Sequence, residues 1–203
     1  MPLTTYQDLK DALVAWPDLQ GEEDLEAYAD TLIGLGESRI NLSLRLRRGI
    51  KSISVPTAVS YYQLPDDFLE IDRVVGENGL PLQFLSQDQV SALANGETQL
   101  SDSCAAYTTD GSNLNFIAPT AFTLTYYAAL PSLEIFDSNW LYVLAPGLYL
   151  YSALIDASIF SKESEQETAR YAAEFQRIAA RLMELDRDSI MPRAQTLRSV
   201  RRL

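Results

Sequence analysis

Residues 22–49 read EEDLEAYADTLIGLGESRINLSLRLRRG, and this stretch predicts one long helix. Acidic side chains occupy its first turn and arginines its last, so both ends complement the helix dipole. A first apolar stripe at three-four spacing consists of Leu25, Tyr28, Leu32, Leu35, Leu42 and Leu46. A second stripe consists of Ile33, Ile40 and Leu44. Two stripes indicate a helix that is covered on more than one side.

After this helix the periodicity changes, and residues 52–130 form short β-rich runs separated by proline and glycine. Asn78-Gly79 is the commonest signal for a type I′ hairpin, and Asp110-Gly111 predicts a second hairpin. Residues 86–94 predict a short helix that ends before Gly96. We therefore expect a small antiparallel sheet between helical segments.

Helical patterns flank this region on both sides. Residues 4–15 predict a helix that Thr4 or Thr5 caps and Pro17 ends. After Pro131, a cap at Asp137 or Ser138 predicts a helix from residue 139, which Pro146 should kink or restart. Residues 163–186 predict a further helix, whose apolar stripe is Tyr171, Phe175, Ile178, Leu182 and Leu185.

These elements predict an α+β fold that is mainly α. We expect a helical bundle of long helices with an inserted small antiparallel β domain and an extended C-terminal tail. The bundle comprises residues 1–51 and 132–187, the β-rich insert residues 52–131, and the extended basic C-terminal arm residues 188–203.

The composition argues against an enzyme. The chain has no histidine, which removes the commonest general base and metal ligand. Its single cysteine, Cys104, excludes an internal disulfide and a multi-cysteine zinc site. The pair Asp66-Asp67 is interpreted as part of a turn after Pro65. The acidic residues 22–24 are interpreted as charges that complement the dipole at the start of a helix. We therefore expect no catalytic residue, no cofactor and no metal.

The net charge of −12 makes the chain a poor candidate for binding nucleic acid through phosphate contacts. The charge is segregated, because residues 52–160 contain twelve acids and only Arg73, whereas the tail is basic. Five arginines lie in that tail: Arg187, Arg193, Arg198, Arg201 and Arg202. The tail is interpreted as an arm that folds onto an acidic partner, with a disordered end and a nucleic-acid arm as alternatives.

Residues 140–160 are the most apolar stretch. Pro146-Gly147 and Asp156 interrupt them, so a buried or interface helix is expected and not a membrane span. The N-terminus lacks the basic and apolar regions of a signal peptide.

Four features together resemble a known family. The first is the acidic start that leads into a long helix ending in arginines. The second is Tyr62 to Ile71, which contains a leucine-proline-x-aspartate-phenylalanine pattern. The third is Leu124 to Pro131, and the fourth is Ala145 to Leu154 before an alanine-rich helix. Their order over about residues 5–187 resembles the head–tail adaptor (connector) proteins of tailed bacteriophages.

The resemblance implies a virion structural protein of the neck region, present in the host cytoplasm during assembly. Such adaptors form a twelve-fold ring beneath the portal, extend the DNA channel and provide a platform for neck or tail proteins. The implied partners are the portal protein, neighbouring copies and a downstream neck or tail protein. DNA would pass through without sequence-specific binding. The C-terminal segment commonly reaches the portal, which assigns portal binding to the five tail arginines.

Two other function classes remain open at this stage. One is a small non-enzymatic binding or regulatory module with a helical body and a β-insert. The other is an enzyme that uses carboxylates alone, such as a glycosidase, which would need two acids facing each other across a cleft.

Overall fold

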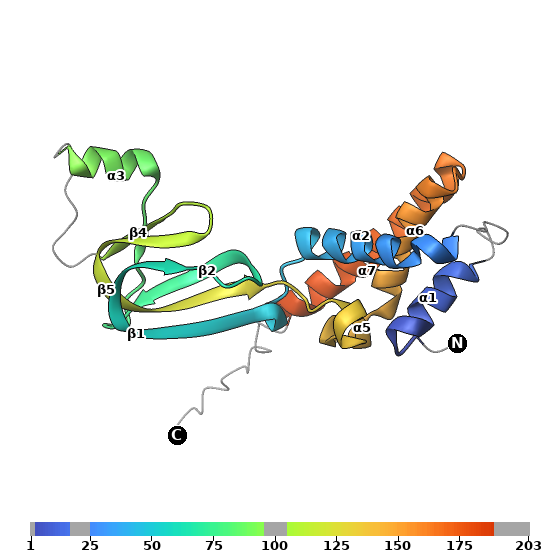
Figure 1. Cartoon of the computed structure of the whole chain (residues 1–203), viewed down its shortest axis with the longest axis horizontal. Coiled ribbons are helices and arrows are strands. Elements are labelled where there is room, and N and C mark those ends of the chain that lie inside the picture. Colours follow the sequence, from blue (N-terminus) through green and yellow to red (C-terminus); the bar gives the residue numbers. More distant parts are fainter. Residues whose placement is uncertain (1–2, 17–24, 96–104, 189–203) are drawn as a thin grey trace, which may run out of the picture. The chain divides into compact units, whose positions relative to one another are not determined.

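The computed structural model describes residues 3–16, 25–95 and 105–188 of the 203-residue chain (Figure 1). The chain divides into two compact units. The helical unit comprises residues 1–47 and 130–203, and the β unit comprises residues 48–129. Each unit is described separately below.

The expected fold class, a helical bundle with a small antiparallel insert, is wrong. The described residues form seven α-helices and a five-stranded mixed sheet, so the sheet is a major part of the fold. Its two longest strands are β1 (Ile50–Gln63) and β5 (Asn113–Ala128). They run through Pro56 and Pro119, which the sequence pattern treats as strand ends. The β1–β5 register shifts between Val55 and Val59, and proline is tolerated at such irregularities.

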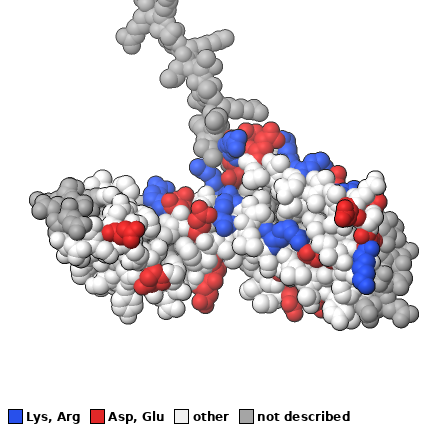
Figure 2. All heavy atoms as spheres, turned by 90° about the horizontal axis from the view of Figure 1, so that it is seen from above, with Lys and Arg blue, Asp and Glu red and all other residues white. Residues whose placement is uncertain are grey.

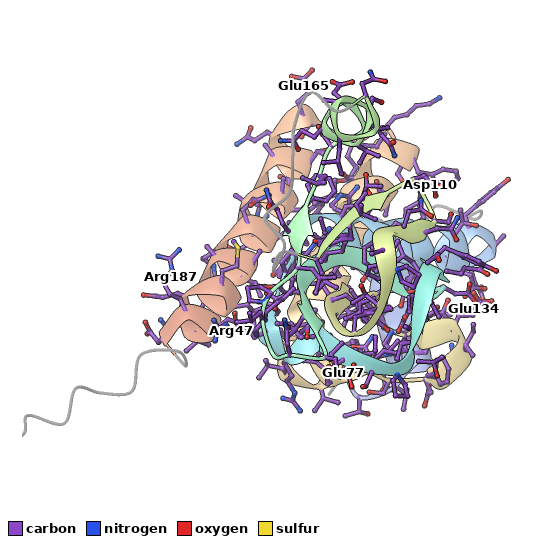
Figure 3. The ribbon with its side chains drawn as sticks, turned by 90° about the vertical axis from the view of Figure 1, so that its left-hand side faces the viewer. Arg47, Glu77, Asp110, Glu134, Glu165 and Arg187 are labelled. Carbon is purple, nitrogen blue, oxygen red and sulfur yellow. The ribbon has the colours of Figure 1, made fainter. Side chains whose placement is uncertain are left out.

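The sheet has β5 at its centre. β1 pairs with β5 antiparallel, as do β2 (Phe68–Gly76) and β4 (Ala106–Thr109). The short β3 (Gln83–Phe84) pairs with β4 in parallel, which makes the sheet mixed. The strands curve around a shared interior, as Figure 3 shows. This interior holds the buried core of the β unit: Leu64, Val74, Leu82, Tyr107, Leu114, Phe116, Phe122, Leu124, Tyr126 and Ala128.

Both glycine turns of the β unit form, but the first is not a type I′ turn. Gly79 has φ 77°, whereas Asn78 is not among the described residues with positive φ. The Gly79 amide donates to the Gly76 carbonyl at 2.9 Å, and the Gly76 amide donates to the Leu80 carbonyl at 2.9 Å. This is a three-residue loop with glycine in its left-handed position. The second hairpin joins β4 to β5, with Gly111 at φ 68°.

Two short helices begin with a capping box, and of the two caps only Thr5 was expected, as one of two candidates. Thr5 and Asp8 form a capping box at α1 (Tyr6–Val14). Ser86 and Gln89 form another at α3 (Gln87–Ala94). Each box satisfies two backbone donors that a helix start leaves unpaired.

The long helix α2 (Leu25–Ser43) ends earlier than the sequence pattern predicts. Arg45 lies beyond the helix, and its guanidinium donates to the Asn41 carbonyl at 2.6 Å. The next residues form the short 3-10 helix η2 (Arg47–Gly49). The arginines therefore lie beyond the last turn of the helix, and one of them, Arg45, satisfies a carbonyl at the helix end with its side chain.

Pro146 restarts the helix as expected. It separates α5 (Trp140–Leu144) from α6 (Pro146–Phe160) and lies in the first turn of α6. Asn139, and not Asp137 or Ser138, caps α5, because its side-chain oxygen accepts from the amides of residues 141 and 142. The same oxygen accepts from the Tyr149 hydroxyl at 2.9 Å. Asp137 follows the one-turn helix α4 (Leu133–Phe136) with φ 61°.

Helix α6 is the centre of the helical unit, packed against both α2 and α7 (Glu165–Asp188) (Figure 1). The backbones of α2 and α6 approach closely at Gly36, whose carbonyl accepts from the Ser152 hydroxyl at 3.0 Å. Arg39 forms an ion pair with Asp156 across the same interface, with 2.6 Å between the guanidinium nitrogen and the carboxylate oxygen. On α7 the predicted stripe is buried at Tyr171, Phe175 and Leu182, but Leu185 is 47% exposed.

Candidate interaction surfaces

The acidic pair Asp66-Asp67 lies in a turn between β1 and β2. The Phe68 amide donates to the Pro65 carbonyl at 3.0 Å, which closes this turn. One oxygen of Asp67 accepts from Lys51 at 2.5 Å, and the other accepts from the Tyr126 hydroxyl at 2.9 Å. Both oxygens of Asp67 are thus used in fixing the turn to the sheet.

The pKa values of Asp67 and Tyr126 agree with a structural role. Partial burial works to raise the pKa of Asp67, but the hydrogen bonds from Lys51 and Tyr126 outweigh it and lower the pKa. Burial, followed by the hydrogen bond to Asp67, raises the pKa of Tyr126 to about 12. A carboxylate held ionised and a phenol held neutral form a stable hydrogen bond and are not poised for proton transfer near neutral pH.

No metal-binding group is found in the part of the chain that the structure describes, since no three histidine, cysteine, aspartate or glutamate side chains gather there. The acidic residues 22–24 and Cys104 lie outside the described residues.

Of the five tail arginines, the structure describes only Arg187. It lies in the last turn of α7 and is exposed. Figure 3 shows it at the described end of α7, on the same side as Arg47, whose amide donates to Asp186 at 3.1 Å. Arg193, Arg198, Arg201 and Arg202 lie outside the described residues.

Several large apolar side chains of the helical unit are exposed. One group, here called the α4–α5 patch, consists of Ile135, Phe136, Val143 and Leu144, with Ile135 75% and Val143 74% exposed. A second group lies on α2 and consists of Tyr28, Leu35 and Leu42. Exposed apolar side chains mark a protein-contact surface where they form a contiguous patch, so these two groups are candidates for such a surface. Sequence reasoning missed the α4–α5 patch, although two apolar pairs on short helices were a signal for it.

The tyrosines contribute less to the surface than their number suggests. Tyr107, Tyr126, Tyr142, Tyr149 and Tyr171 are buried within their own unit. Burial raises the pKa of Tyr149, and the donated bond to Asn139 satisfies its hydroxyl. Tyr28 and Tyr61 are the large exposed ones among the described residues.

Charges of both signs are distributed over the helical unit, with uncharged surface between them (Figure 2). On α7, arginines pair with glutamates three residues away, as at Arg177 and Glu174, 2.7 Å apart. Such exposed pairs add little stability and instead keep the surface hydrated. Among the described helices, none combines the length and the apolarity needed to cross a bilayer.

The geometry thus offers exposed protein-contact surfaces. Comparison with known families identifies one match: a family model described as SU10 adaptor protein matches residues 4–201. A search of curated protein sequences finds no match.

Proposed function

The chain belongs to the SU10 adaptor protein family, and we propose that it forms a ring beneath the portal of a tailed bacteriophage. As a member of this family it is a structural adaptor of the phage virion. In our proposal the ring is dodecameric, extends the DNA channel and carries the neck or tail proteins. The observation that carries the proposal is the extent of the match, which includes both the helical unit and the β unit.

The charge of the chain is compatible with a DNA channel. Residues 52–129 contain nine acidic residues and one basic residue, Arg73. An acidic bore repels phosphates and leaves the duplex free to slide, whereas a basic bore would retain it. We expect part of this acidic excess to line the channel. A ring whose bore is clearly basic would contradict this expectation.

We propose that the C-terminal arm, residues 188–203, binds the portal together with Arg187. Its arginines would meet acidic side chains of a portal subunit through charge-assisted hydrogen bonds. Arg187 supports this assignment, because it is exposed at the described end of α7.

The arm is tested by replacing Arg187, Arg193, Arg198, Arg201 and Arg202 together with alanine and measuring capture on immobilised portal rings. We expect capture to fall at least tenfold while the circular dichroism spectrum stays unchanged. The matched control replaces Arg170 and Arg177, which are exposed on α7 outside the arm. Portal capture that is the same for the arm variant and the native chain would contradict the assignment.

The ring itself is tested by negative-stain microscopy of the chain mixed with its portal. Closed rings on the portal face are expected. Single copies that never assemble, at any ratio of the two proteins, would argue against the proposed function.

A further inference from the structure

The α4–α5 patch begins on a one-turn helix that the rest of the helical unit holds at both ends. At the start of α4, the two carboxylate oxygens of Glu37 accept from the Ser132 hydroxyl at 2.9 Å and the Leu133 amide at 2.7 Å. At its other end, Asp137 accepts from the Tyr6 amide at 2.9 Å. A single helical turn has little stability of its own, so these contacts fix the direction of its exposed apolar side chains.

The α4–α5 patch has an acidic border. Glu134 is exposed on α4 (Figure 3), and Asp137 follows directly after this helix. Burial, followed by the charges of Asp8 and Asp137, raises the pKa of the Tyr142 hydroxyl to about 12, so both carboxylates lie near this one group. Within the described ranges, none of these three carboxylates forms an ion pair, and Lys10 of α1 is instead paired with a carboxylate of α2.

One segment outside the described residues has the composition that complements this patch. Residues 17–24 contain four acidic residues and residues 96–104 two, with no base in either segment. Residues 189–203, in contrast, contain four arginines and no acidic residue. Opposite charges at a border and apolar side chains at its centre are what two matching surfaces share. The large apolar residues of this segment are Ile190, Met191, Leu197, Val200 and Leu203.

The length of this segment allows the contact to form within one copy. Its fifteen residues span up to roughly 50 Å when extended. The longest helix of the same unit, α7 with 24 residues, is about 36 Å long. The segment can therefore fold back along the whole helix from which it continues. The tether also holds it near its own patch at an effective concentration of about 1 mM, so a weak contact is sufficient.

We infer that residues 189–203 dock on the α4–α5 patch of the same copy as long as no portal is bound. This inference rests on the proposed function, in which the same arm binds the portal. The apolar residues of the arm cover the exposed side chains of α4 and α5, and its arginines face the carboxylates at the border. Docking on the patch and binding to the portal exclude each other, so the portal receives an arm that the free subunit keeps covered.

Trypsin measures the docked state, because every arginine of residues 189–203 is a cleavage site. The rate of cleavage in this segment of the full chain is followed by intact mass, with a synthetic peptide of residues 188–203 as the free reference. At an effective concentration of about 1 mM, a contact with a Kd of about 0.1 mM leaves roughly one arm in ten free. We therefore expect cleavage to be about tenfold slower in the chain than in the peptide.

Two substitutions test the two parts of the contact. Ile135→Ser should weaken docking about tenfold and so raise the cleavage rate about fivefold, because it removes apolar surface from the patch. Glu134→Gln removes one border charge and should raise the rate about twofold, less so at high salt. The matched controls Ile159→Ser, at the end of α6, and Glu26→Gln, on α2, should leave the rate unchanged. All four side chains are exposed, so the variants should fold.

The dependence on protein concentration distinguishes the possible occupants of the patch. Docking within one copy gives the same protection at every concentration. Protection that grows with protein concentration would show that the arm docks on another copy, and would overturn the inference. A chain cleaved as fast as the peptide would also overturn it, as would equal cleavage of Ile135→Ser and Ile159→Ser.

The portal takes no part in these measurements, so the two proposals can fail separately. A protected arm in a chain that the portal does not capture would refute portal binding by the arm and leave docking on the patch intact. An unprotected arm in a chain that the portal captures would refute docking on the patch and leave the adaptor function intact.

Discussion

Two glycines of α2, only two residues apart, should respond in opposite ways to the same substitution. A Cβ at Gly36 would lie 3.1 Å from the Ala153 amide nitrogen and 3.3 Å from the Ser152 Cβ. A Cβ at Gly34 would meet no atom within 4 Å. Comparing the two alanine substitutions therefore separates the effect of packing between α2 and α6 on stability from the effect of alanine's higher helix propensity.

The magnitudes follow from these distances. Alanine stabilises a helix interior by about 0.5–1 kcal/mol relative to glycine, and Gly34→Ala should gain this amount. Gly36→Ala gains the same propensity but forces α2 away from the backbone of α6, and overpacking of this kind costs about 1–3 kcal/mol. Moving α2 away from α6 would also lengthen the hydrogen bond that the Ser152 hydroxyl donates to the Gly36 carbonyl, which is 3.0 Å long in the native chain. The two variants should differ by about 1–3 kcal/mol, with Gly36→Ala the less stable.

The measurement is urea unfolding of both variants and the native chain, followed by far-ultraviolet circular dichroism at low protein concentration. Comparing the variants cancels the propensity gain, since both sites lie inside the same helix. Equal stabilisation by both substitutions would refute the close approach of α2 and α6 at Gly36.

Three further predictions concern single side chains. Thr5→Ala removes the N-cap of α1 and should lower the free energy of unfolding by about 1 kcal/mol, measured in urea against the exposed Thr57→Ala. Asn139→Leu leaves the Tyr149 hydroxyl and the first amides of α5 without their acceptor, and should cost roughly 2–4 kcal/mol; a loss below about 0.5 kcal/mol would contradict the network. Folding raises the pKa of the Tyr126 hydroxyl to about 12, so the unfolded chain loses this proton before the folded chain does as the pH rises. The free energy of unfolding that this hydroxyl contributes is therefore complete below about pH 10 and should decline between about pH 10 and about pH 12. Tyr126→Phe should make this decline shallower in pH-dependent unfolding, and an unchanged slope would argue against the assignment.

Local signals in the sequence predicted local structure well. The cap at Thr5, the short helix after Ser86, the hairpin at Gly111 and the helix restart at Pro146 formed as expected, and the turn at Gly79 formed with another geometry than the type I′ turn predicted for it. Each of these depends on residues within a few positions of one another. The family resemblance, which rests on the order of such signals, was confirmed by the match over residues 4–201.

The size of the sheet was not predicted, because proline reads as a strand end in sequence. Pro56 and Pro119 instead lie within β1 and β5, and the pairing register shifts near them. Whether a strand continues past a proline depends on its partner strand, which lies about 60 residues away in the chain. Fold class therefore depended on long-range pairing, and the prediction of a small insert was wrong.

The sequence alone determined that α2 carries more apolar surface than one contact needs. Only the tertiary structure decided which part of it α6 covers: Leu25 and Leu32 are buried, whereas Leu35 and Leu42 remain exposed. The first stripe read from the spacing mixed buried and exposed positions, because positions seven residues apart on a helix are rotated by about 20° relative to one another, so the stripe drifts from the buried side to the exposed side. The place where the α6 backbone meets Gly36 sets that rotation. Helical periodicity follows from the chain itself, but the direction in which each face points follows from what packs against it.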